Sequence, residues 1–198
     1  MRILAGIFKG RVLPTLTVEG CRPAMAKVRE ALFSMLEARG QAMDGTRVMD
    51  VFAGTGSLGL EALSRGAAYA FFLERNKTLA RRLSGNCRDL GLGGSRFAVA
   101  AADALKTLSR PPQAPFDTVF VDPPYGLDLL APVLDLLASR GWLAEGAMVV
   151  AEVESRLTVK TWPAALQPEA DRTYGQTRIL LWRHNPTIPP STPELSTP

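Results

Sequence analysis

The sequence predicts an α/β domain in which a mostly parallel sheet of seven strands carries helices on both faces and ends in an antiparallel hairpin. One observation is that short apolar runs alternate with stretches of helical periodicity from residue 41 to residue 184. A second is that no helix separates the last two runs, which favours an antiparallel return of the chain. The composition agrees, because 46% of the 198 residues are hydrophobic and 21% are charged, as in an ordinary globular domain.

The individual elements follow from the spacing of the apolar residues. Apolar residues at helical spacing run from Val28 to Leu36, and Gly40 ends that helix. Further helices are expected at 58–64, 79–90 and 127–138. The seven expected strands are 47–52, 69–73, 96–100, 117–121, 147–153, 157–161 and 177–183.

The chain divides into three regions. Residues 1–40 are expected to form a basic arm and a helix that pack on the main domain, which covers residues 41–184. Residues 185–198 are rich in proline, serine and threonine, so we expect a disordered tail. No membrane span is expected, because the longest apolar run, residues 67–73, is far shorter than the ~20 residues that a spanning helix needs.

The net charge of +4 lies wholly in the first thirty residues. These hold six basic and two acidic side chains, whereas the two signs balance over the rest of the chain. A glycine-rich basic arm suits a nucleic-acid phosphate backbone. A solvated surface would explain the same charge equally well.

The histidine and cysteine content excludes several classes of protein. His184 is the only histidine, which argues against Ser-His-Asp and Cys-His hydrolases and against histidine-ligated metal sites. Cys21 and Cys87 show no Cys-x-x-Cys spacing, so we expect a reducing compartment, no zinc site and two small, interior side chains. The N-terminus lacks the apolar core of a secretory signal, which makes the cytoplasm the expected location.

A glycine-rich turn follows the first expected strand. Gly54, Gly56 and Gly59 have the Gly-x-Gly-x-x-Gly spacing of a nucleotide-binding turn, in which the backbone turns sharply and approaches a ligand. Glu74 lies twenty residues after Gly54, at the end of the next strand, where a carboxylate can bind two ribose hydroxyls. A turn that serves only helix–strand packing would also select glycine.

A dinucleotide and S-adenosylmethionine are both possible ligands of such a turn, and three features favour the second. Asp50 lies just before the glycines, where a carboxylate would attract a sulfonium and an ammonium but repel a pyrophosphate. Asp103 closes the third strand and is placed to accept hydrogen bonds from an adenine amino group. No Tyr-x-x-x-Lys pair is present, and the single histidine, His184, lies where the sequence turns proline-rich and is not available for hydride chemistry.

A second motif, Asp122-Pro123-Pro124-Tyr125, follows the strand 117–121. In a parallel sheet the carboxyl ends of the strands line the ligand crevice, so this loop should face the glycine turn. The two prolines make the loop rigid, and the Asp122 carboxylate and the Pro123 carbonyl can accept both hydrogens of an exocyclic amino group. Tyr125 would stack on the flipped base. The alternative is a capped turn without a ligand.

Together these motifs resemble those of class I amino-methyltransferases. Further segments are similar to the bacterial RsmD family, which methylates the exocyclic N2 of one guanine, the guanine-966 type, in small-subunit (16S) ribosomal RNA. The segments that carry this second resemblance are 2–11, Arg22-Pro23, 28–33, 60–67 and Tyr174-Gly175-Gln176-Thr177. The resemblance extends over residues 2–183.

The resemblance implies a Rossmann-like methyltransferase fold, S-adenosylmethionine as cofactor, no metal, and 16S rRNA as partner, within a small ribosomal subunit or an assembly intermediate. It implies catalytic roles for Asp122, Pro123, Pro124 and Tyr125. It implies cofactor-binding roles for Asp50, Phe52, Ala53, Gly54, Thr55, Gly56, Glu74, Arg75, Asp103 and Ala104. It implies RNA-binding roles for Arg2, Lys9, Arg11, Arg22, Lys27, Arg29 and Tyr174. We expect a monomer.

Some features depart from the family or leave alternatives open. The family usually has threonine where this chain has Ala24, and commonly Asp-Arg where this chain has Ala26-Lys27. Adenine N6 is an alternative target, although enzymes that act on adenine in DNA usually carry a separate recognition region. A catalytically silent RNA-binding fold is another alternative. Other side chains are expected to be structural: Asn86 and Arg88 on a surface, and Trp142, Trp162 and Trp182 in packing.

Overall fold

The computed structural model describes residues 1–14, 26–159 and 161–186, and within them it contains seven strands and five helices. The strands are β1 Arg47–Val51, β2 Tyr69–Leu73, β3 Phe97–Ala100, β4 Phe116–Val121, β5 Leu143–Glu154, β6 Leu166–Tyr174 and β7 Thr177–His184. The helices are α1 Ala26–Glu37, α2 Ser57–Ser64, α3 Lys77–Asp89, α4 Ala104–Leu108 and α5 Leu130–Ser139.

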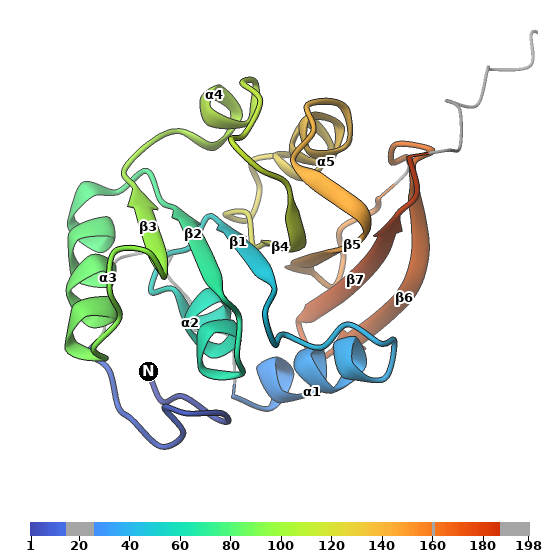
Figure 1. Cartoon of the computed structure of the whole chain (residues 1–198). Coiled ribbons are helices and arrows are strands. Elements are labelled where there is room, and N and C mark those ends of the chain that lie inside the picture. The colour runs from blue at the N-terminus through green and yellow to red at the C-terminus, as the bar shows by residue number, and fades with distance from the viewer. Residues whose placement is uncertain (15–25, 160, 187–198) are drawn as a thin grey trace, which may run out of the picture.

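All seven strands form one sheet in the order β3-β2-β1-β4-β5-β7-β6. Strands β1 to β5 are parallel, and β7 returns antiparallel between β5 and β6 (Figure 1). The predicted fold class is therefore confirmed. The strand order reverses between β1 and β4, which is where open α/β sheets bind their ligands.

The two faces of the sheet carry separate apolar cores. Helices α1, α2 and α3 cover one face, where they pack on side chains such as Val48, Phe120 and Val150. Helices α4 and α5 cover the other face, where they pack on Met49, Val119 and their neighbours (Figure 1). Because side chains alternate along a strand, Asp50 of β1 and Glu152 of β5, two residues after Val48 and Val150, also face α1 and α2. No helix within the described ranges is both long and apolar enough to cross a membrane.

The prediction of the C-terminal hairpin was right in topology and wrong in one strand. The partner of β7 is β6, whereas residues 157–159 form no regular structure. Strand β6 was missed because it is a polar edge strand in which only Leu166 is buried. A break in its pairing lies between Pro168 and Ala170, at the edge position where a strand tolerates proline. The tail from residue 187 lies outside the described residues.

The N-terminal arm, residues 1–14, folds back on itself through a bridge between Arg2 and Val12 and docks on α2. The backbone N–H groups of Leu4 and Ala5 donate to the Glu61 carboxylate at 2.8 and 2.9 Å. At Gly6, which has φ of 78°, a Cβ atom would lie 1.7 Å from the Ser64 carbonyl oxygen. Only glycine allows this approach, so the arm is an integral part of the fold.

Candidate active site

The glycine turn between β1 and α2 combines a tight backbone with close packing. Gly54 and Gly56 adopt left-handed conformations, with φ of 53° and 75°. A Cβ atom on Gly56 would lie 2.3 Å from a methyl carbon of Leu83 on α3, so the position requires glycine. Phe52 also has a positive φ of 65°, which costs a non-glycine residue about 1–3 kcal/mol. Strain of this kind is typical of functional sites.

Glu74, at the end of β2, holds the turn in place. Its Oε2 atom accepts from the backbone N–H of Gly54 at 2.9 Å, and its Oε1 atom accepts from that of Asn76 at 2.7 Å. A carboxylate has about four acceptor positions, so two hydrogen bonds leave capacity for ribose hydroxyls. Arg75, the next residue, is exposed.

Asp103 has a structural role that the sequence analysis did not assign. It is the N-cap of α4, where Oδ1 accepts from the backbone N–H of Lys106 at 3.0 Å. The carboxylate is exposed at the end of β3, and its remaining lone pairs can still accept from an adenine amino group. Ala104, the first residue of α4, is buried. The predicted cofactor-binding residues of β1, β2 and β3 therefore all lie at the carboxyl ends of adjacent strands.

Asp50 is a buried carboxyl beneath the turn. Its Oδ2 atom accepts from the backbone N–H of Gly59 at 2.9 Å. Burial raises the pKa of Asp50 to about 7 against the lowering effect of that hydrogen bond, and nearby Glu74 and Glu152 raise it further. A positive charge beside this carboxyl would favour its ionised form. The site is thus suited electrostatically to a cationic ligand.

The Asp122–Tyr125 loop lies directly beside the glycine turn. Val121 of β4 pairs with Val51 of β1, and the backbone N–H of Asp122 donates to the Val51 carbonyl at 3.3 Å. Burial raises the pKa of Asp122 well above its ordinary value, and the charges of Glu152 and Asp50 add to this effect. An acceptor loop and a candidate nucleotide turn therefore share one edge of the sheet.

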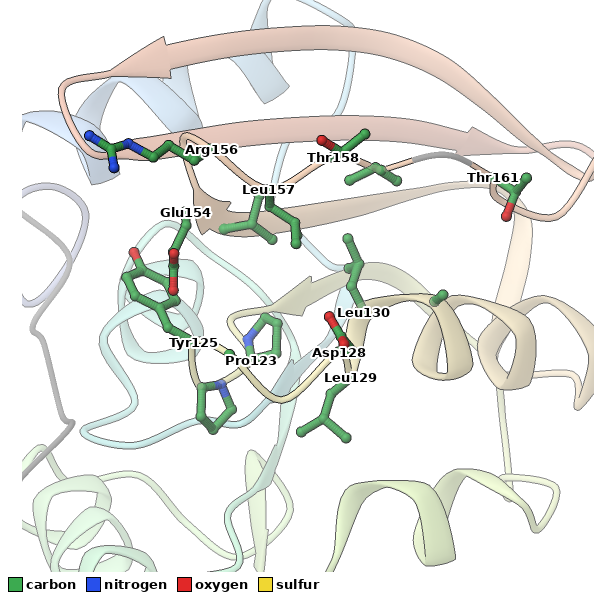
Figure 2. Close-up of a pocket in the computed structure, with 15 residues that line it drawn as sticks. Pro123, Tyr125, Asp128, Leu129, Leu130, Glu154, Arg156, Leu157, Thr158 and Thr161 are labelled. Atoms are coloured by element: carbon green, nitrogen blue, oxygen red, sulfur yellow. The ribbon is translucent and has the colours of Figure 1, made fainter.

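A cavity of about 480 Å³ adjoins the acceptor loop. Figure 2 shows Pro123, Tyr125 and Glu154 at one end of the cavity and Thr161 at the other. Asp122 does not line it, because the side chain of Asp122 lies on the α1–α2 face of the sheet. The cavity therefore adjoins the acceptor loop through Pro123, Pro124 and Tyr125 but does not include Asp122.

Glu152 and Glu154 are candidate site residues that the sequence analysis missed. Both belong to β5, and Glu154 lines the cavity while Glu152 is buried. The signal that could have found them is the presence of carboxylates in an otherwise apolar strand end, residues 147–154.

The predicted RNA-binding residues differ in how exposed they are in the structure. Arg2, Lys9 and Arg11 are exposed on the arm, and Lys27 is exposed at the start of α1. Arg22 lies outside the described residues. Tyr174 is half-buried in the β6–β7 turn, which pairing between Glu154 and Thr177 brings to the active-site edge of the sheet.

The structure corrects the prediction that Arg29 binds RNA. Its side chain is 3% exposed, its Nη2 atom donates to the Arg2 carbonyl at 2.6 Å, and its Nε atom lies 3.6 Å from Glu61. A side chain enclosed in this way cannot contact RNA, so the prediction for Arg29 was wrong. Asn86 was also misplaced on the surface, because it is buried and donates to the Pro14 carbonyl.

The tryptophan side chains divide between core and surface. Trp142 and Trp182 are buried, as expected for packing residues. Trp162 packs its ring against that of Trp182 with the centroids 6.0 Å apart, yet it remains 40% exposed. Cys87 is buried and free, and burial raises its pKa to about 12, so its thiol is unreactive at neutral pH.

Comparisons with known proteins agree over most of the chain. The family model described as conserved hypothetical protein 95 matches residues 1–183. The ribosomal RNA small subunit methyltransferase D of Haemophilus influenzae is 38% identical over 166 residues, which cover 82% of this chain and 84% of the relative. The Escherichia coli protein of the same name is 36% identical over 183 residues, covering 92% and 89%. The solved structure of Escherichia coli YhhF matches with a TM-score of 0.84 at 34% identity, covering 93% and 98%.

Proposed function

The chain belongs to the conserved hypothetical protein 95 family, whose relatives include small-subunit ribosomal RNA methyltransferases, and we propose that it methylates the exocyclic N2 of a guanine in 16S ribosomal RNA. The observation that carries this proposal is the juxtaposition of the glycine turn with the Asp122–Tyr125 loop on the paired strands β1 and β4. A methyl donor and an amine acceptor bound to these two loops would lie side by side.

The residues at the turn fit S-adenosylmethionine, which when bound supplies a methyl group on a sulfonium. Asp50, with the backbone of Ala53 to Gly56, would hold the positively charged methionine part. Glu74 would bind the ribose hydroxyls, and Asp103 with Ala104 would meet the adenine. The support for this fit is the group of buried carboxyls Asp50, Asp122 and Glu152, because a cation would offset the burial, and the smaller effect of Glu74 and Glu152, that raise the pKa of Asp50.

The target amine would be oriented by the acceptor loop. The Asp122 carboxylate and the Pro123 carbonyl accept the two N–H hydrogens of N2, which turns the nitrogen lone pair out of conjugation with the ring. Tyr125, 37% exposed, offers its ring for stacking on the flipped base. The chain thereby contributes mainly position and orientation to an in-line displacement.

Glu154 supports guanine over adenine as the target. Its carboxylate lines the cavity at the same end as Tyr125 (Figure 2). Guanine presents an N1–H donor beside N2, which a carboxylate can accept, whereas adenine presents a lone pair beside its amino group. A carboxylate at this position would therefore repel adenine and bind guanine.

The arm and the Tyr174 turn would contact the RNA outside the target base. Arg2, Lys9 and Arg11 are exposed on a segment that is pinned to α2, so their charges are held in fixed positions on the surface at little further entropic cost. The protein would act as a monomer in the cytoplasm, and its substrate would be a small ribosomal subunit or an assembly intermediate.

The test uses small ribosomal subunits from cells that lack this gene. These are incubated with the protein and labelled S-adenosylmethionine, and the RNA is digested to identify the modified nucleoside. N2-methylguanosine from a single site is the expected product. N6-methyladenosine would overturn the guanine target, and no incorporation despite cofactor binding would indicate a silent fold or another nucleic acid.

A further inference from the structure

Glu152 lies next to Asp122 on the neighbouring strand. Ala151 of β5 pairs with Val121 of β4, so the following residues of the two parallel strands are neighbours as well. Parallel strands are roughly 4.8 Å apart, and both side chains follow residues that face the α4–α5 core, so both point to the opposite face. Two carboxyl groups therefore lie side by side at the active-site edge.

Glu152 is buried without full hydrogen bonding. Its side chain is 7% exposed, and its Oε2 atom has no hydrogen-bond partner. Such an atom costs about 1–3 kcal/mol when it is left unpaired, and more when it is charged. Within the described ranges, no three histidine, cysteine, aspartate or glutamate side chains are grouped to hold a metal ion, so a metal does not explain it.

Glu152 has acidic neighbours on the strands of the sheet and a basic neighbour on α1. Asp122 and Asp50 lie on β4 and β1 with their carboxyls facing the same side, and Glu74 closes β2 beyond Asp50. Burial raises the pKa of Glu152, and Arg29 opposes this effect from α1.

Arg29 is not a dedicated partner of Glu152. It makes its ion pair with Glu61 of α2, which also binds Arg65 at 3.0 Å. Glu152 therefore remains a like-charged neighbour of Asp122, and the counter-charge of Arg29 is shared with Glu61.

We infer that Glu152 is a positioning residue that acts through Asp122, keeping the Asp122 carboxylate basic enough to take the proton that the target amine loses. This inference rests on the proposed function. In the step, the nitrogen–methyl bond forms, the sulfonium–methyl bond breaks to leave a neutral thioether, and one N–H proton passes to Asp122. A neighbouring negative charge makes that transfer more favourable.

The test compares Glu152→Gln with the wild type across a pH series of single-turnover methylation. The substitution removes a like charge, so the pKa of Asp122 should fall and the acid limb of the rate profile should move to lower pH. The plateau rate should fall about tenfold, because a weaker base accepts the proton less readily. Glu152→Asp should restore part of both properties. Glu145→Gln, which changes an exposed carboxylate on the same strand, should alter neither.

A second measurement does not depend on turnover. Carbon-13 labelling of aspartate carboxyls allows the Asp122 signal to be followed by NMR, with Asp122→Asn used to assign it. The signal should titrate at lower pH in Glu152→Gln than in the wild type. An unmoved titration, or an unmoved acid limb in an active and folded variant, would overturn the inference. Failure of the wild type to methylate RNA would instead overturn the proposed function.

Discussion

Two buried glutamates in this molecule have opposite surroundings. Glu61 on α2 is 1% exposed and is fully partnered, because it accepts from two backbone N–H groups of the arm and pairs with Arg29 and Arg65. Glu152 on β5 is 7% exposed, has an oxygen without a hydrogen bond, and sits among other carboxyls. The first arrangement compensates a buried charge, so that loss of either partner is costly, whereas the second places like charges together, and a cationic ligand can relieve their repulsion.

Removing the partnered glutamate should have the largest effect on stability. Glu61→Ala leaves Arg29 buried beside two unpaired backbone N–H groups, and breaking such a buried pair costs about 3–5 kcal/mol. Urea unfolding of the variant should show this loss. Glu37→Ala, which removes the exposed partner of Arg65, is the matched control and should cost about 1 kcal/mol or less. Equal losses for both variants would show that the enclosure of Glu61 is not the cause.

Removing the acceptor carboxylate should affect catalysis rather than folding. Asp122→Ala should lower the single-turnover methylation rate about a thousandfold, within the range for a positioned acid–base group. Binding of S-adenosylmethionine, measured by calorimetry, should be retained, since the turn and Glu74 are unchanged. A variant with full activity would contradict the role assigned to Asp122.

The acid cluster should also appear in the pH dependence of stability. The folded pKa of Asp50 is about 7, above the ordinary value of 3.8, so the folded state holds its proton more tightly than the unfolded state. The contribution of Asp50 is therefore largest at low pH and is lost as the pH rises through the folded pKa, by up to roughly 4 kcal/mol. Urea unfolding measured at about pH 5 and about pH 8 gives the free energy of unfolding at each pH. Between these two values the free energy of unfolding should fall less for Asp50→Asn than for the wild type. Equal falls would mean that Asp50 titrates alike in both states.

The smallest effect should come from the exposed cations of the arm. Lys9→Gln combined with Arg11→Gln should lower RNA affinity about tenfold and reduce the salt slope by about 1.4, at about 0.7 per phosphate contact on single strands. Filter binding across a salt series measures both quantities. The double variant Arg81→Gln and Arg82→Gln on α3 controls for general charge, and an equal change in slope there would remove the arm from the interface.

The local motifs were readable from the sequence because neighbouring residues determine them. The Gly54–Gly59 spacing and the Asp122–Tyr125 run each specify a backbone turn, and both lie at strand ends as expected. The alternation of apolar runs likewise predicted β1 to β5, since a strand buried on both faces must be apolar throughout. Strand β6 was not predicted, because an edge strand does not need to be apolar throughout.

Strands β1 to β5, the glycine turn and the acceptor loop could be predicted from the sequence, because each depends on residues close together in the chain. Which charged side chains become neighbours depends instead on how the elements pack. Arg29 looks like an arm cation in sequence, yet the docking of α1 encloses it with Glu61. Glu152 is thirty residues from Asp122, and only the pairing of β5 with β4 makes them neighbours. Electrostatic interactions act through space, so their partners follow from the strand order rather than from position in the sequence.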